Sequence, residues 1–149
     1  FNVNGSQPKN IPYMAGSTSH DMAPPILQSM TRKWISAREK PSYTWYFDRI
    51  LPGEELGAWH SSDLWYWFDT LDNGWRPWTD KDRRLASLMS DYLVNFVKGG
   101  NPNGEGLPTW ESAQSCKGAM FLGEGEERMS NPKKLKLWYT MMTNKNVGF

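Results

Sequence analysis

Short apolar runs and turn-forming residues follow one another along the first part of the chain. The run IPYMAG, residues 11–16, ends at Gly16, and this pattern is typical of a buried strand that leads into a turn. The polar segment STSHDM, residues 17–22, predicts that turn. A pair of prolines then suits the first turn of a helix over residues 24–38, because apolar side chains recur there at helical spacing, at Ile26, Leu27, Met30 and Trp34.

A second strand and a loop come next. Residues 42–51, SYTWYFDRIL, are rich in the aromatic and β-branched types that fill a well-covered strand. Proline and glycine mark residues 51–59 as a loop, with His60 at its end. The Ser-Ser-Asp run at 61–63 is placed to cap a short apolar helix over residues 64–68. His60 is therefore predicted at a loop-to-helix junction after a strand.

The clearest helical pattern begins at Thr79. Asp82, three residues later, makes an approximate capping box, and a pair of glycines follows Lys98. Apolar residues recur at intervals of three and four and predict one continuous buried stripe, formed by Leu85, Leu88, Met89, Tyr92, Leu93, Phe96 and Val97.

The remaining elements are shorter. Residues 101–108 are a turn-rich loop, AMFLG at 119–123 is a short edge strand, and a final amphipathic helix ends near Asn144, with Leu135, Trp138, Tyr139 and Met142 on one face. The order of elements is α/β, but two convincing strands are too few to form a doubly wound sheet that buries helices on both of its faces. The pattern predicts part of a larger fold.

Composition excludes several classes of function. The chain has 17 basic and 16 acidic residues and a net charge of +1, which is too balanced to attract nucleic acid or an anionic membrane, and the lysine cluster at 133–136 fits a solvated helix face. No apolar run approaches the roughly 20 residues of a membrane span. Because Cys116 is the only cysteine, it can form neither an internal disulfide nor a thiolate metal cluster. We expect a soluble protein without a cofactor, in a reducing compartment such as the cytoplasm. If the chain is a segment of a longer protein, the location of that protein stays open.

The start of the chain indicates a fragment. It has no initiator methionine, and FNVNGSQPKN, residues 1–10, is polar and turn-prone like a linker, without the pattern of a signal peptide. We therefore expect residues 1–149 to be a segment of a longer protein.

Two histidines can act near neutral pH. His60 is the better candidate because loops at strand ends often hold catalytic residues, although a structural hydrogen-bonding role is equally open. His20 precedes Asp21 directly, and neighbouring side chains usually point apart, so a structural or exposed position is expected for it. Neither has a second histidine at helical spacing, so no metal site is predicted.

The residues around His60 resemble a known family. GAWHSSDLWYWF, followed by WRPWTDKDRRLASLMSDYLVNFVKGGNPNGEGLPTW, is similar to the region around and after the catalytic histidine of type-B carboxylesterases, the cholinesterase-like branch of the α/β-hydrolases. The match extends over most of Tyr43 to Trp110. It implies that the chain is α/β, the C-terminal part of an α/β-hydrolase fold with its last central strands and C-terminal helices. It also implies a small-molecule carboxylic ester as substrate.

The same resemblance implies the catalytic pair. His60 matches the catalytic histidine, and Asp21 occupies the turn in which the family carries its acid, usually glutamate. The interval between the two is short for the family, which suggests a trimmed cap region, and a turn-capping role for Asp21 stays open. If the strands before these residues are parallel neighbours, both side chains emerge at the carboxyl edge of the sheet and should meet.

The nucleophile is not found in this sequence. A search for G-x-S-x-G finds nothing, and Ser61 and Ser62 are too close to His60 along the chain to serve as a nucleophile elbow. We expect a chain that is inactive alone, that needs the missing N-terminal part of the same protein as its partner, and that self-associates through exposed apolar surface.

The nine tryptophans leave other functions open. The aromatic cluster Trp59, Trp65, Tyr66, Trp67 and Phe68 is interpreted as core beneath the histidine loop, with an acyl-pocket wall as the alternative. The chain could instead be an aromatic-rich binding module, or belong to a cholinesterase-like protein that has lost catalysis.

Overall fold

The fold is built on one mixed sheet. The computed structural model describes residues 8–123 and 127–130. The strands lie side by side in the order β1 (Met14–Thr18), β2 (Tyr43–Phe47), β3 (Ala119–Leu122) and β4 (Arg128–Ser130). The first three are parallel, and β4 runs antiparallel to β3. The parallel pairing of the first two strands, on which the expected meeting of Asp21 and His60 depends, is present. The strand predicted at 119–123 is present as β3, but its predicted place at the edge is wrong, because β3 lies between β2 and β4.

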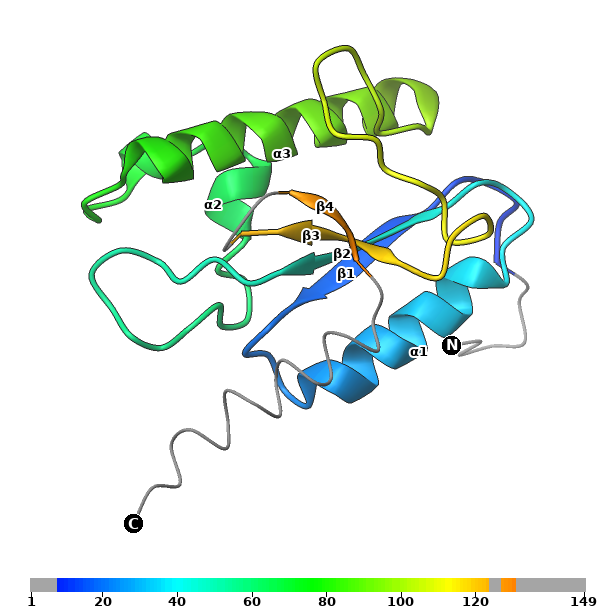
Figure 1. Cartoon of the computed structure of the whole chain (residues 1–149), viewed down its shortest axis with the longest axis horizontal. Coiled ribbons are helices and arrows are strands. Elements are labelled where there is room, and N and C mark those ends of the chain that lie inside the picture. The colour runs from blue at the N-terminus through cyan, green and yellow to red at the C-terminus, as the bar shows by residue number, and fades with distance from the viewer. Residues whose placement is uncertain (1–7, 124–126, 131–149) are drawn as a thin grey trace.

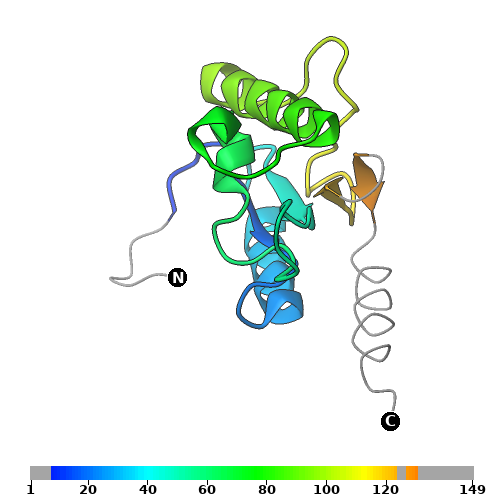
Figure 2. The same ribbon diagram turned by 90° about the vertical axis from the view of Figure 1, so that its left-hand side faces the viewer.

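Helices cover both faces of the sheet. Helix α1 (Pro24–Ser36) connects β1 to β2 and lies on one face. The connection from β2 to β3 contains α2 (Leu64–Trp67), the 3₁₀ turn η1 (Leu71–Asn73) and α3 (Asp80–Gly99), and α3 lies across the opposite face (Figures 1 and 2). The α/β class predicted from the sequence is confirmed in this three-layer arrangement.

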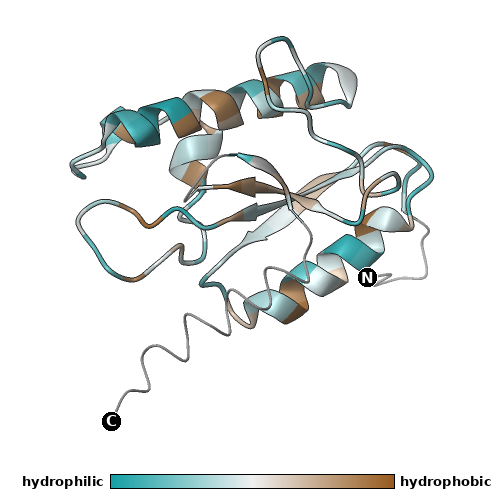
Figure 3. Cartoon of the chain, in the orientation of Figure 1, coloured by the Kyte–Doolittle hydropathy of each residue, from teal (hydrophilic) through white to brown (hydrophobic). Residues whose placement is uncertain are grey.

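The main core lies between the sheet and the layer of α2 and α3. Figure 3 shows β3 as the most hydrophobic strand of the sheet, in agreement with its sequence AMFL. The fully buried side chains of this core include Phe47, Leu51, Tyr66, Leu85, Met89, Tyr92, Trp110, Met120 and Leu122.

Helix α3 begins and ends where its sequence signals predict. The Thr79 side chain accepts from the backbone N–H of Asp82, and the Asp82 carboxylate accepts from the backbone N–H of Thr79. Gly100 ends the helix in the left-handed conformation, at φ 71°. The predicted stripe is correct at Leu85, Met89 and Tyr92 but wrong at Val97, which lies near the end of the helix and is 75% exposed.

The inward face of α1 differs from the prediction. Its buried residues are Pro24, Gln28 and Ile35, whereas the apolar stripe Ile26, Leu27 and Met30 is exposed. Gln28 is turned inward because its Oε1 accepts a hydrogen bond of 2.9 Å from the buried Ser17 hydroxyl of β1.

Gly16 does not close the first strand, as its position after an apolar run suggested. It lies inside β1, where an added Cβ would overlap the backbone and the indole ring of Trp45 on β2. This close approach explains the glycine.

Three sequence features lie partly or wholly outside the described residues: the predicted helix ending near Asn144, the lysine cluster at 133–136 and most of the linker-like start. Within the described ranges, no helix is both long and apolar enough to cross a membrane.

Candidate active site

The turns that follow β1 and β2 lie side by side. His20 and Trp59 form an isolated parallel bridge, and the backbone N–H of His20 donates to the carbonyl of Ala58 at 2.9 Å. This bridge extends the parallel pairing of β1 with β2 beyond the ends of both strands. The residues that follow the bridge, Asp21 and His60, therefore become neighbours although 39 positions separate them.

Asp21 and His60 are in direct contact. His60 Nδ1 lies 3.1 Å from each carboxylate oxygen of Asp21. The Asp21 side chain is only 9% exposed and also accepts the backbone N–H of Met22 at 2.7 Å, whereas the His60 ring is 76% exposed. A carboxylate at Nδ1 keeps the proton of the neutral ring on that nitrogen and leaves Nε2 as the acceptor. The predicted contact is present, and the aspartate also takes part in its own turn.

His20 occupies the outer side of the same junction. Its ring is exposed, and its Nδ1 accepts the backbone N–H of Ala58 at 3.3 Å and lies 2.9 Å from the hydroxyl of Ser19. These contacts agree with the structural or exposed position expected for His20. They also show a side-chain role that its place beside Asp21 in the sequence did not reveal.

The residues after His60 do not cap α2 as predicted. Asp63 occupies the N-cap position with helical backbone angles and makes no side-chain cap. Its carboxylate instead accepts the indole N–H of Trp67 at 2.9 Å, and burial raises its pKa. Ser62 is fully buried, and Ser61 has a left-handed backbone at φ 70°. Asp63 therefore binds the Trp67 indole in place of the predicted cap.

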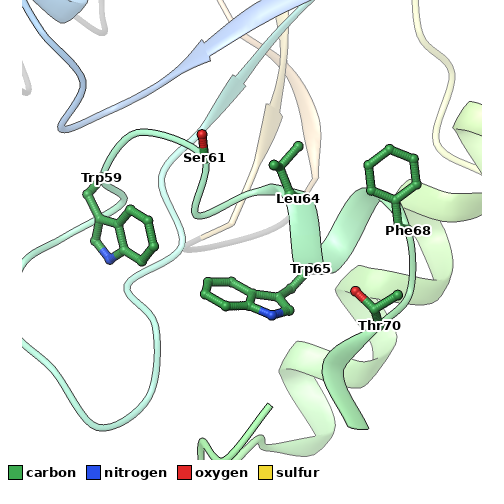
Figure 4. Close-up of a pocket in the computed structure, with 6 residues that line it drawn as sticks. All are labelled: Trp59, Ser61, Leu64, Trp65, Phe68 and Thr70. Atoms are coloured by element: carbon green, nitrogen blue, oxygen red, sulfur yellow. The ribbon is translucent and has the colours of Figure 1, made fainter. Parts of the chain in front are cut away.

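The aromatic cluster has two environments. Tyr66 and Trp67 are buried, as the core interpretation predicts, whereas Phe68 is exposed and does not follow it. Trp59 and Trp65 are partly buried and meet edge to face, with ring centroids 5.9 Å apart. These two side chains border an open hollow of about 490 Å³. Figure 4 shows the residues that line it: Trp59, Ser61, Leu64, Trp65, Phe68 and Thr70.

A polar pair borders the tryptophans. The Trp59 indole N–H donates to Glu54 at 2.5 Å, and Arg76 donates to the same carboxylate at 2.9 Å. The guanidinium of Arg76 also lies 5.7 Å from the centre of the Trp65 ring. The hydrogen bond from Trp59, followed by that from Arg76, lowers the pKa of Glu54 despite partial desolvation.

A buried carboxylate connects this region to α3. Asp82 accepts hydrogen bonds from Arg49 at 2.7 and 3.2 Å, from the Thr79 hydroxyl at 2.5 Å and from the Tyr66 hydroxyl at 2.8 Å. Burial alone would raise its pKa, but the bonds from Arg49, Thr79 and Tyr66 outweigh burial and hold the pKa at about 2. Burial and the adjacent carboxylate in turn raise the pKa of Tyr66.

Sequence reasoning recognised Asp82 only as part of a capping box. Its contacts with Arg49 and Tyr66 join residues 33 and 16 positions away, and no local signal indicates them. The residues that the structure describes contain no group of three or more His, Cys, Asp or Glu side chains that could hold a metal ion.

Solved structures show which fold this is. An esterase from the anaerobe Clostridium hathewayi, described as able to hydrolyse aliphatic aromatic polyesters, matches with a TM-score of 0.64 and 22% sequence identity, over 78% of this chain and 25% of that chain. A thermophilic PNB esterase matches with a TM-score of 0.54 and 23% identity, over 66% of this chain and 22% of that chain. These proteins have the α/β-hydrolase fold, and the likeness supports that fold for this chain.

Curated relatives are also esterases. Liver carboxylesterase 1 of Oryctolagus cuniculus is 38% identical over 45 residues, which are 30% of this chain and 8% of the relative. Cocaine esterase of Homo sapiens is 38% identical over 52 residues, 34% of this chain and 9% of the relative. The matches thus span only a small share of the relatives' own length. The model of the carboxylesterase family matches residues 13–138, and the chain therefore belongs to the carboxylesterase family.

Proposed function

We propose that this chain supplies the histidine and the acid of a Ser-His-acid triad that hydrolyses carboxylic esters. The supporting observation is the contact of His60 Nδ1 with both oxygens of Asp21, which leaves Nε2 on an exposed ring. Nε2 of His60 takes the proton of a serine hydroxyl as that oxygen attacks the ester carbonyl, and then gives the proton to the departing alkoxide. Asp21 keeps the proton of the neutral ring on Nδ1 and stabilises the imidazolium that forms.

The serine and the oxyanion hole are proposed to lie outside residues 1–149. The sequence contains no G-x-S-x-G, and Ser62, two residues after His60, is buried. Residues 1–149 would then form the C-terminal segment of one carboxylesterase domain, with the nucleophile-bearing N-terminal part as its partner. Small-molecule carboxylic esters are the proposed substrates.

The first experiment compares the isolated chain with free imidazole. We expect the chain to hydrolyse an activated phenyl ester no faster than imidazole at equal concentration, because a base and an orienting acid alone form no acyl-enzyme. Burst kinetics from the purified chain, abolished by His60→Gln, would place a nucleophile inside the 149 residues and contradict this division of the site.

The second experiment uses the longer polypeptide encoded by the parent gene. Asp21→Asn should lower kcat by a factor on the order of 10,000, and His60→Gln by a factor on the order of 1,000,000, as for other triads, with a smaller effect on KM. Asp72→Asn is the matched control, since it removes an exposed carboxylate that pairs with Arg83. Equal activity of all three variants would refute the assignment of the pair.

A non-catalytic binding function is the alternative. The open hollow beside Trp59 and Trp65 favours it, because the exposed part of these partly buried rings can stack on an apolar or sugar-like ligand. A parent protein without esterase activity, whose tryptophan fluorescence is quenched by such a ligand, would support this alternative.

A further inference from the structure

The backbone of Ala58 is held on two sides by one residue. The N–H of His20 donates to the Ala58 carbonyl at 2.9 Å, and the N–H of Ala58 donates to Nδ1 of the His20 ring at 3.3 Å. Ala58 is fully buried, so its N–H has no access to bulk water in place of this bond. The imidazole therefore completes a ring of contacts two residues before His60.

The same imidazole packs against Gly57. Its backbone is left-handed at φ 71°, and a Cβ at this position would overlap the ring atoms of His20. The ring thus packs directly on the peptide that enters the histidine loop. This contact involves the side chain of His20, beyond the backbone pairing that any residue at position 20 can make.

We infer that His20 is a positioning residue, whose imidazole holds the loop at Gly57 and Ala58 so that His60 meets Asp21. The inference deepens the proposed function and rests on it for the catalytic meaning of the His60–Asp21 contact. The positioning itself is a property of the described loop and can be tested without turnover.

The contacts give the two histidines opposite neutral tautomers. Nδ1 of His20 accepts the Ala58 N–H, so the proton of this ring is on Nε2, with the Ser19 hydroxyl as a second donor at 2.9 Å. Nδ1 of His60 faces the Asp21 carboxylate, so the proton of that ring is on Nδ1. Long-range proton–nitrogen NMR correlations distinguish these tautomers and report each contact separately.

The test uses the isolated chain and two substitutions at position 20. His20→Ala removes the acceptor for Ala58, and we expect amide hydrogen exchange at Ala58 to become about tenfold faster, the change produced by losing one ordinary hydrogen bond. The Nδ1–H tautomer of His60 should decrease at the same time. His20→Asn places an amide oxygen close to the original Nδ1 position and should restore both readings.

Asp21→Asn separates positioning from direct contact. It should change the tautomer of His60 while leaving amide exchange at Ala58 slow, because the His20 imidazole is retained. If His20→Ala leaves the tautomer of His60 unchanged while circular dichroism shows a folded chain, the inference is wrong. If His20→Ala does not fold, His20→Asn decides: a wild-type tautomer and slow Ala58 exchange support positioning, and their loss overturns it. An inactive parent protein would refute the proposed catalysis and leave these two readings unaffected.

Discussion

The buried carboxylate of Asp82 should be a major source of stability for the layer that supports the histidine loop. Its side chain has no exposed surface, and its partners are Arg49, Thr79 and Tyr66. The pKa of about 2 compares with about 3.9 in an unfolded chain, so the ionised form contributes between about 2 and 3 kcal/mol to the free energy of unfolding near neutral pH. Asp82→Asn removes this charge and leaves the shape nearly unchanged.

Asp82→Asn should lower the free energy of unfolding by about 3 kcal/mol at pH 7, which is the lower end of the range for breaking a buried ion pair. The loss is not larger because the asparagine oxygen still accepts from some of the same donors. The midpoint of urea unfolding should fall by between about 1 and 2 M. Asp72→Asn is the control on the neighbouring turn. Asp72 also accepts from an arginine at 2.7 Å but is exposed, and its substitution should leave the midpoint unchanged within error.

The pH dependence provides a second check. Because the folded-state pKa of Asp82 is lowered, its stabilisation is complete above pH of about 4 and is lost as the pH falls through about 2. The difference between the wild type and Asp82→Asn should therefore shrink as the pH is lowered from 5 toward 2. Equal midpoints for Asp82→Asn and Asp72→Asn at pH 7, or a difference that does not change with pH, would refute the reasoning.

Two further predictions concern α1. Ala23 precedes this helix in the left-handed region at φ 48° and makes no side-chain cap. Because glycine adopts this conformation without strain, Ala23→Gly should raise the free energy of unfolding by between about 0.5 and 1 kcal/mol. An unchanged urea midpoint would show that the backbone at Ala23 is not strained. The exposed Ile26 and Met30 should make the isolated chain bind a hydrophobic dye and self-associate. Ile26→Lys combined with Met30→Lys should reduce both in dye fluorescence and light scattering, and a wild-type monomer that binds no dye would disprove the prediction.

The features predictable from sequence have local signals. Thr79 and Asp82 form a capping box, and the glycines after Lys98 end the helix, so the bounds of α3 follow from residues within one turn of each end. The approach of Asp21 to His60 is long-range but follows from a general rule, since parallel neighbouring strands bring their carboxyl ends to one edge.

The features that were missed depend on tertiary contacts. Helical spacing identifies an apolar stripe on α1 but not which side faces the sheet, and the buried hydroxyl of Ser17 turns Gln28 inward. Strand β4 has only three residues, Arg128–Ser130, and no apolar alternation that would predict a strand. It forms through its antiparallel hydrogen bonds with β3. The role of His20 depends on Ala58, 38 positions away.

The short side chain of Asp21 fits this arrangement. An aspartate side chain is one methylene shorter than a glutamate side chain, so the backbones of the two turns must lie close together for its oxygens to meet the ring. The bridge between His20 and Trp59 continues the pairing of β1 and β2 to the residues directly before Asp21 and His60. Both Asp21 oxygens lie 3.1 Å from Nδ1, so the aspartate already has the reach that this pairing of the two turns requires. The short side chain of Asp21 and the close pairing of the two turns therefore act together to bring the carboxylate to His60, and His20 contributes to that pairing through its backbone and its imidazole.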